Sequence, residues 1–318
     1  MKRSPQDAEG LRSWDSYPER STPPMISLLV NTTLLLGRPL MRLLLWPIVL
    51  YFFLTGRDAR RASRDYLRRV LEHEPRAQDI LRHFHTFAVV FIDRVYLLSD
   101  REEKLQIDAR VAEDALRTIR EKQGCLLLVA HFGSFEALRI KGTRRAEAPI
   151  RIVLDRQVGR MAMSLLERLN PVLAARIIDA SRRGPGLMLD IKQAVEAGHI
   201  VGIMADRARA DERSISVTFL GGSIRIPAGP WIIAGMLGVP VLLGFGIYRG
   251  GSQYECRLQL FEQRIDFPRE RREQVLQDCA QRFAARLEQQ VREAPYNWFN
   301  FHDYWLDGAP ERDGTAAH

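Results

Sequence analysis

The chain has 318 residues, of which 46% are apolar, and a formal net charge of +8 at pH 7. This length is enough to bury a full core, and we expect one large domain with an N-terminal attachment. The basic residues, nearly all of them arginine, favour anionic partners such as phospholipid, nucleic acid or an acidic protein without choosing between them. Neither a disulfide framework nor a zinc site is indicated, because the three cysteines are isolated and lack C-x-x-C spacing (Cys125, Cys256 and Cys279).

The N-terminal part consists of a polar stretch, residues 1–24, and an apolar segment, residues 25–56. No secretory signal is expected, because the first stretch is polar and charged. In the apolar segment Arg38, Arg42 and two prolines interrupt the run, and the uncharged stretch after Arg42 is shorter than the ~20 residues that a perpendicular transmembrane helix needs. We expect an interfacial hairpin or a tilted span whose arginines reach the headgroups, with a buried core helix as the alternative.

A basic stripe at helical spacing follows the apolar segment directly. Beside an apolar anchor, each such charge attracts anionic headgroups by about 1 kcal/mol, and the stripe predicts that this flank stays cytoplasmic. The alternative is an ordinary solvated helix face. The stripe consists of Arg57, Arg60, Arg61, Arg64, Arg68 and Arg69.

Residues 57–306 are expected to form the main domain. Apolar residues at helical spacing predict a helix over 82–98, and residues 269–293 read as one long amphipathic helix. Between them, short apolar runs alternate with helical patterns, which indicates an α/β fold with a mixed, largely parallel sheet flanked by helices. The polar tail, residues 307–318, is expected to be disordered. The expected strands are residues 125–130, 150–154, 199–205, 239–248 and 254–261.

His131 directly follows the buried strand 125–130, and ligands in open α/β sheets gather at the carboxyl ends of strands. A Phe-Gly-Ser turn then leads into a helix whose first turn holds Glu136, where the helix dipole favours an acid. Five residues across this turn can bring the carboxylate back to the imidazole. Glu136 would then fix the tautomer, while the other ring nitrogen takes a proton from an attacking hydroxyl or amine. A purely structural histidine is the alternative, and His302 is the other histidine with site-like surroundings.

Residues 129–138, V-A-H-F-G-S-F-E-A-L, resemble the first motif of the bacterial lipid A lauroyl and myristoyl acyltransferases, which read H-[FW]-G-N-W-E there. These enzymes belong with the lysophospholipid acyltransferase-like superfamily. The resemblance continues through residues 194–206, 217–222 and 227–241, and it covers roughly residues 35–300. It implies an acyltransferase that works at the membrane with an H-x4-E dyad. The glycerol-3-phosphate type is less similar, because its F-P-E-G motif is missing here.

The resemblance assigns roles by position. His131 becomes the general base oriented by Glu136, and Asp206 matches the family's aspartate after the following strand. Arg176 is the spacing-based candidate for the family's functional arginine, with Arg182 and Arg183 close by.

Three further residues are expected to bind substrate: Arg225, Arg249 and Trp298. Arg225 follows Gly221-Gly222-Ser223, which can present backbone donors to a phosphate or an oxyanion or can be a plain loop before a capped helix. The aromatic C-terminal cluster, residues 298–305, is either a lid on the substrate or a hydrophobic closure of the fold.

The resemblance also implies the partners. The donor is expected to be the thioester of acyl carrier protein, or of coenzyme A, and the acidic carrier would dock on the arginine-rich surface. The acceptor is expected to be a hydroxyl or an amine of a lipid or glycolipid at the cytoplasmic face of the bacterial inner membrane, where anionic lipids hold the protein through a peripheral or single-span anchor. No metal, free cofactor or nucleic acid is expected.

Two departures narrow the resemblance. Where the lipid A enzymes have Trp followed by a basic pair, this chain has W-F-N-F-H-D-Y-W, and Arg207-Ala208 replaces the family's polar pair after the aspartate. The aromatic ending resembles a divergent branch found with aryl-polyene or pigment lipid gene sets rather than the enzymes that modify a phosphorylated disaccharide. A non-catalytic module that binds membrane or carrier protein is the alternative function, and an intact His131 and Glu136 speak against it.

Overall fold

The computed structural model describes residues 23–121, 124–144, 149–156, 159–182 and 184–306. The predicted disordered tail and most of the polar N-terminal stretch lie outside the described residues. The helices are α1 (Pro23–Thr55), α2 (Arg57–Leu71), α3 (Ala77–Leu98), α4 (Glu113–Arg120), α5 (Phe135–Arg144), α6 (Arg160–Leu169), α7 (Pro171–Ala174), α8 (Gly184–Glu196), α9 (Gly229–Leu237) and α10 (Arg272–Glu293).

A seven-stranded mixed sheet forms the centre of the described chain, with the strand order β1-β9-β8-β2-β5-β3-β4. Neighbouring strands pair in parallel, except for the antiparallel hairpin of β8 and β9. This confirms the predicted α/β class and largely parallel sheet. The strands are β1 (Gln106–Val111), β2 (Cys125–Val129), β3 (Ile150–Leu154), β4 (Ile178–Asp179), β5 (Ile200–Met204), β8 (Val241–Gly250) and β9 (Gln253–Glu262).

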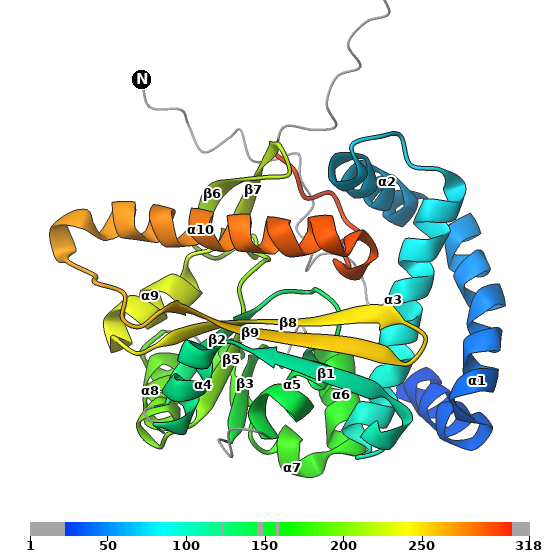
Figure 1. The fold of residues 1–318 in the computed structure, drawn as a ribbon, viewed down its shortest axis with the longest axis horizontal. Coiled ribbons are helices and arrows are strands. Elements are labelled where there is room, and N and C mark those ends of the chain that lie inside the picture. Colours follow the sequence, from blue (N-terminus) through cyan, green and yellow to red (C-terminus); the bar gives the residue numbers. More distant parts are fainter. Residues whose placement is uncertain (1–22, 122–123, 145–148, 157–158, 183, 307–318) are drawn as a thin grey trace, which may run out of the picture.

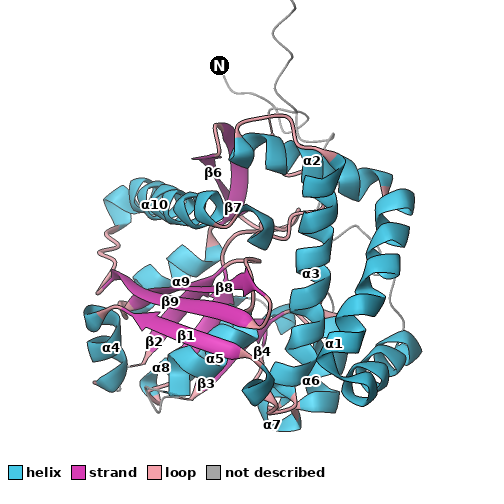
Figure 2. Ribbon diagram, turned by 45° about the vertical axis from the view of Figure 1, so that its right-hand side comes forward, coloured by secondary structure: helices cyan, strands magenta, loops and turns pink. Residues whose placement is uncertain are grey.

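Helices cover both faces of the sheet, which explains the unbroken apolar sequence of β2 (Figures 1 and 2). Leu126 and Leu128 point into a core shared with α8, α9 and α10, whereas Leu127 and Val129 point into a core shared with α4, α5 and α6. A strand in such a position cannot alternate apolar with polar residues, because neither of its faces meets water.

Three strand features were not among the predicted elements. β1 is an edge strand with an exposed acid and an exposed arginine, and β4 has only two residues, so neither shows a strong apolar run. β6 (Ser214–Phe219) and β7 (Gly222–Pro227) form a separate antiparallel hairpin. Leu220 and Gly221, both with positive φ, make its turn, and Gly222 begins β7, which favours the plain-loop interpretation of this glycine pair over an anion site.

The N-terminal helix α1 lies beside α3 and is kinked at Gly37, whose φ of 76° falls in the left-handed region (Figure 1). The arginines that interrupt its apolar sequence point into the protein. Arg38 makes a two-pronged ion pair with buried Asp93 of α3, with N–O distances of 2.7 and 2.8 Å. Arg42 donates to the carbonyl of Gly251 at 2.5 Å and to Tyr248 Oη at 2.8 Å. The expectation that these arginines reach out to headgroups is therefore wrong.

Only part of the basic stripe of α2 faces outward, because some of its arginines contact other residues of the protein. Arg69 pairs with Asp65 and lies over the ring of Trp305, and Arg68 pairs with Glu74. Arg57 and Arg64 face outward, as a solvated or membrane-facing stripe requires.

The Arg38–Asp93 pair predicts a large stability effect. Asp93→Ala should lower the free energy of unfolding by about 3–5 kcal/mol, because it leaves the charge of Arg38 without its buried partner. Denaturant unfolding of the detergent-solubilised protein measures this. The matched control, Asp108→Ala on the exposed side of β1, should change stability by no more than about 0.5 kcal/mol. Equal effects from both variants would contradict the assignment.

Candidate functional site

His131 and Asp206 lie side by side at the carboxyl edge of the sheet. His131 follows β2, and Asp206 follows the adjacent parallel strand β5, so the sheet brings together two residues far apart in sequence. The Nδ1 atom of His131 is 2.9 Å from Oδ1 of Asp206, and the His131 backbone N donates to Oδ2 at 3.0 Å. Since a carboxylate only accepts, Nδ1 carries the hydrogen and Nε2 is left to accept a proton.

Asp206 is fully buried, and each contact it makes stabilises the charged form. The indole Nε1 of Trp298 donates to Oδ2 at 3.2 Å, and the Arg207 guanidinium lies 3.9 Å from the same oxygen. Burial alone would raise the pKa of the carboxyl, but the charge and hydrogen bonds of His131, together with Arg207, hold that pKa well below its usual range. Asp206 is therefore ionised at every pH at which the protein is expected to work.

The surroundings keep His131 neutral at pH 7. Burial lowers its pKa below the ordinary 6.5, and the positive charges of Arg207 and Arg94 lower it further, against the opposing effect of Asp206. The side chain nevertheless keeps about a third of its surface exposed, so a substrate group can reach it.

Glu136 has a different partner from the one that the sequence suggested. It lies in the first turn of α5, buried, and its carboxylate is 2.6 Å from Nε of Arg94 on α3. The carboxylate on the Nδ1 side of the His131 ring is Asp206 instead. The H-x4-E spacing thus places Glu136 near the site, while the orienting contact comes from the neighbouring strand.

The turn after His131 runs very close to β8. Ser134 N donates to the carbonyl of Gly246 at 2.6 Å, and Gly133 has a φ of 59°. A Cβ on Gly133 would lie 1.9 Å from the Gly246 oxygen, and one on Gly246 would lie 2.0 Å from the Ser134 oxygen. Both positions therefore require glycine for the turn to approach the strand.

The C-terminal aromatic segment closes the site from behind. The backbone N of Phe299 donates to the carbonyl of His131 at 2.9 Å, and Arg207 Nη2 donates to the carbonyl of Phe299 at 2.5 Å. Tyr304 Oη donates to the backbone carbonyl of Asp206. His302 also lies in this group: burial, Arg207 and His131 lower its pKa to about 3. The packing of the segment favours a hydrophobic closure of the fold over a lid on the substrate.

The sequence matches the family model of bacterial lipid A biosynthesis acyltransferases over residues 25–307. The chain belongs to this family. The match covers α1, the whole sheet and the aromatic segment, so the His131–Asp206 pair lies within the part that defines the acyltransferase family. No curated protein matches the sequence at a significant level.

Among the described residues, no group of three or more His, Cys, Asp or Glu side chains is arranged to hold a metal ion. The candidate site is built around the pair of His131 and Asp206. This pair provides an oriented imidazole that can take up a proton and return it.

The predicted arginine Arg176 is not beside His131. It precedes β4 and lies at the amino ends of the parallel strands. There burial, Arg151 and Arg176 together lower the pKa of His199. This edge is opposite to that of His131, and the expectation is corrected on this point. Arg182, which directly follows β4, lies at the carboxyl edge, and Arg183 lies outside the described residues.

The three residues predicted to bind substrate have different surroundings. Trp298 is fully buried, and its indole nitrogen donates a hydrogen bond to the Asp206 carboxylate. Arg249 pairs with Glu255 and Glu293. Arg225 lies exposed on β7, opposite Ser216, where its role stays a prediction.

Sequence reasoning missed the part played by Arg94 and His83. Both are on α3, 11 residues apart and so on one helical face, and this periodicity was the available signal. His83 Nε2 is 2.9 Å from the carbonyl of Trp298, and Nδ1 is 2.8 Å from Ser63 Oγ. Because a carbonyl only accepts, Nε2 carries the hydrogen and the Ser63 hydroxyl donates to Nδ1. His83 thus fixes the backbone of the residue that supports Asp206.

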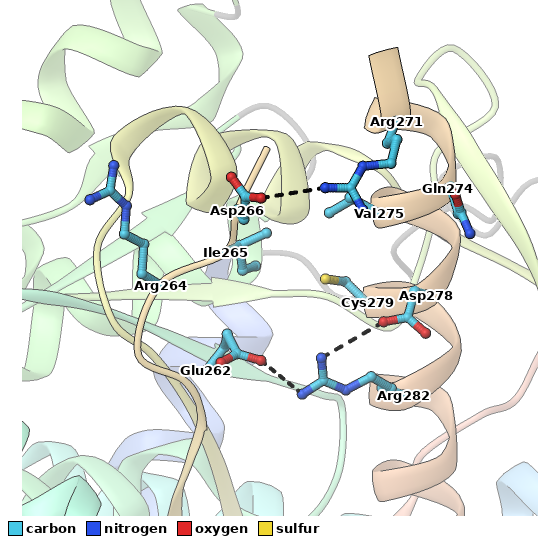
Figure 3. Close-up of a pocket in the computed structure, with 10 residues that line it drawn as sticks. All are labelled: Glu262, Arg264, Ile265, Asp266, Arg271, Gln274, Val275, Asp278, Cys279 and Arg282. Atoms are coloured by element: carbon cyan, nitrogen blue, oxygen red, sulfur yellow. Dashed lines mark hydrogen bonds and ion pairs between the residues drawn. The ribbon is translucent and has the colours of Figure 1, made fainter. Parts of the chain in front are cut away.

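A cavity of about 390 Å³ lies away from His131, between the end of β9 and α10 (Figure 3). Its charged side chains largely compensate one another: Arg282 lies between Glu262 and Asp278, at 3.1 and 3.8 Å, and Arg271 is 3.8 Å from Asp266. We assign it no role in the acyltransferase chemistry.

The buried His83 predicts an acid-sensitive fold. Burial lowers its pKa to about 4, against 6.5 in the unfolded chain. Between these values the unfolded state binds the extra proton, so stability falls as the pH drops from 6.5 to 4, by about 3 kcal/mol in all. His83→Gln should flatten the curve of unfolding free energy against pH over this window, measured by denaturant titration at each pH. His73→Gln, at an exposed position, should leave the curve unchanged, and an unflattened curve for His83→Gln would refute the assignment.

Proposed function

We propose that the protein moves a fatty acyl group from an acyl carrier protein thioester to a hydroxyl, or an amine, of a lipid or glycolipid, with His131 as the general base. Membership of the lipid A biosynthesis acyltransferase family supports acyl transfer and a lipid acceptor. The observation that carries the mechanism is the His131 ring, held through Nδ1 by a buried, ionised carboxylate, with part of the side chain still exposed.

In the proposed reaction, Nε2 of His131 takes the proton of the acceptor hydroxyl while the oxygen attacks the thioester carbonyl. The tetrahedral intermediate then expels the thiolate, which leaves as a thiol after His131 returns the proton to it. One C–O bond forms, one C–S bond breaks, and the imidazole ends as it began. The charge on the imidazolium that exists in between is stabilised by Asp206.

Asp206 takes the orienting role in this proposal, and Glu136 acts through Arg94. The Glu136–Arg94 pair joins the first turn of α5 to α3, so it fixes the helix that begins just after the catalytic turn. Burial, and after it the charge of Arg207, lowers the pKa of His131 and so keeps the imidazole neutral before the reaction. Arg207 occupies the position at which the sequence departs from the family's usual polar pair.

The donor would approach along the carboxyl edge of the sheet. An acidic carrier protein is attracted by a positive surface, and Arg182 is exposed at this edge. For the acceptor we favour an amphiphile without a phosphorylated disaccharide, such as an aryl-polyene or pigment lipid, because a buried aromatic segment stands where the lipid A enzymes have a basic pair.

Turnover should depend on His131 as the base and on Asp206 as the residue that orients it. His131→Ala and Asp206→Asn should each lower turnover by about 10²- to 10⁴-fold, because the first removes the base and the second removes the acceptor that fixes its tautomer. Glu136→Gln should have a smaller effect. Radiolabelled acyl carrier protein thioesters and membrane lipid extract serve as substrates, and both thioester loss and labelled lipid are measured.

Asp108→Asn, at an exposed acid of β1, is the matched control and should behave as wild type. Equal turnover by wild type and His131→Ala with every donor chain length would rule out His131 as the base. Loss of turnover in Glu136→Gln but not in Asp206→Asn would return the orienting role to Glu136.

The pH dependence of kcat/KM should report the pKa of His131. The lowered pKa of His131 places the acid limb of kcat/KM below pH 6.5, since the base must be neutral to act. Arg207→Gln removes a positive charge near the ring, so the pKa of His131 should rise and the acid limb should move to higher pH. Initial rates over pH 4.5–8 measure the limb, and exposed Arg117→Gln should leave it in place. A limb that does not move in Arg207→Gln would contradict this role.

A further inference from the structure

We propose that α1 lies flat in the surface of a bilayer, with the exposed face of its second half immersed in one leaflet, and does not cross the membrane. This inference concerns how the protein sits on lipid, and it does not depend on the acyl-transfer chemistry proposed above. It goes beyond the sequence pattern, which left an interfacial hairpin, a tilted span and a buried core helix open.

Length and composition alone allow either arrangement. Ser27–Thr55 is long and apolar enough to cross a membrane. The straight part after the kink at Gly37 is about 27 Å long at 1.5 Å per residue, close to the ~30 Å of the hydrocarbon layer. The surroundings of the helix therefore decide whether it lies in the membrane surface or crosses the membrane.

The outward face of this part is apolar throughout. Leu43, Trp46 and Leu54 are 65%, 51% and 62% exposed. An apolar surface this continuous is rare on a protein that meets only water, and it marks a contact with lipid or another protein. The other exposed large apolar residues of this part are Leu40, Leu44, Ile48, Leu50, Tyr51 and Phe52.

The inward face of the same helix is fixed to the domain. Met41 and Leu45 are buried in a small core with Val89, Ile92 and Tyr96 of α3. Arg38 and Arg42 add the ion pair to Asp93 and the hydrogen bonds to the turn between β8 and β9. Both charges of the helix are thus used on the protein side, and the outer face carries none.

This docking opposes a transmembrane orientation. If α1 crossed the bilayer in its docked position, α3 and the β8–β9 turn would enter the hydrocarbon with it. The strand after that turn begins with the exposed polar side chain of Gln253, and Arg249 with its two acidic partners is close by in sequence. Burying such groups in hydrocarbon costs several kcal/mol for each unsatisfied group. A helix lying in the plane buries only its apolar face.

The charges next to α1 identify the occupant as lipid. Helix α2 begins two residues after α1 ends, and its Arg57, Arg61 and Arg64 are exposed. Arg61 still meets Asp303, whereas Arg57 and Arg64 turn to the outside. A positive group beside an apolar strip complements an anionic headgroup beside its acyl chains. An apolar face that binds a partner protein does not require positive charges beside it.

The first experiment measures binding to vesicles by flotation. Leu44→Glu combined with Phe52→Glu should lower the bound fraction of full-length protein on phosphatidylglycerol-containing vesicles at least 10-fold. Met236→Glu and Leu189→Glu are the controls, because these apolar residues on α9 and α8, away from α1, are even more exposed than Leu44 and Phe52, and they should bind as wild type does. Arg57→Glu with Arg64→Glu should weaken binding to anionic vesicles and not to zwitterionic ones. Unchanged binding of the α1 variant would overturn the assigned face.

The second experiment distinguishes lying from crossing. The three native cysteines are buried, so single cysteines at Asn31 and Thr55, near the two ends of the long helix, can be labelled selectively. In a flat orientation, a membrane-impermeant maleimide should label both in inverted inner-membrane vesicles and neither in right-side-out vesicles. Labelling of one position in each type of vesicle would show a crossing helix and overturn the proposal. His131→Ala should give the wild-type pattern, so a failure of the catalytic assignment leaves this test unaffected.

Discussion

A single buried carboxylate organises the site. Asp206 binds the ring and the backbone N of His131, accepts the indole hydrogen of Trp298, and is adjacent to the guanidinium of Arg207. Burying such a charge is costly unless donors and opposite charges surround it, and here they come from His131 after β2, from Arg207 next to Asp206 and from Trp298 in the C-terminal segment. The same contacts that stabilise the charge also orient the His131 ring, so folding and the geometry of the candidate site depend on the same few contacts.

Much of the fold could be predicted from local pattern. The apolar runs at residues 125–130, 150–154 and 199–205 correspond to β2, β3 and β5, because buried parallel strands are apolar on both faces. His131 could be placed at the carboxyl edge for the same reason. Its partner could not be derived from spacing, because the contact to Asp206 depends on which strands are neighbours. Resemblance to the family pointed to Asp206, and only the strand order shows why that residue meets the ring.

The arginines of α1 show a second limit of sequence patterns. Hydropathy counts Arg38 and Arg42 as interruptions of an apolar run, but the effect of a charge depends on the direction in which it points. Both point into the domain, where Asp93, Tyr248 and the Gly251 carbonyl receive them. A helix that looks too polar from its sequence therefore has an outer face without charge. The partners lie more than 50 residues away along the chain, beyond the reach of any local window.

The position of Trp298 has a consequence for synthesis. Helix α1 leaves the ribosome well before the indole that binds Asp206, because the whole sheet lies between them in the chain. If α1 binds the bilayer as proposed, the nascent chain meets lipid before the His131 ring has its fixed orientation. The protein would then reach the membrane with an incomplete site, and the site would become competent only once Trp298 has been made and has packed against Asp206.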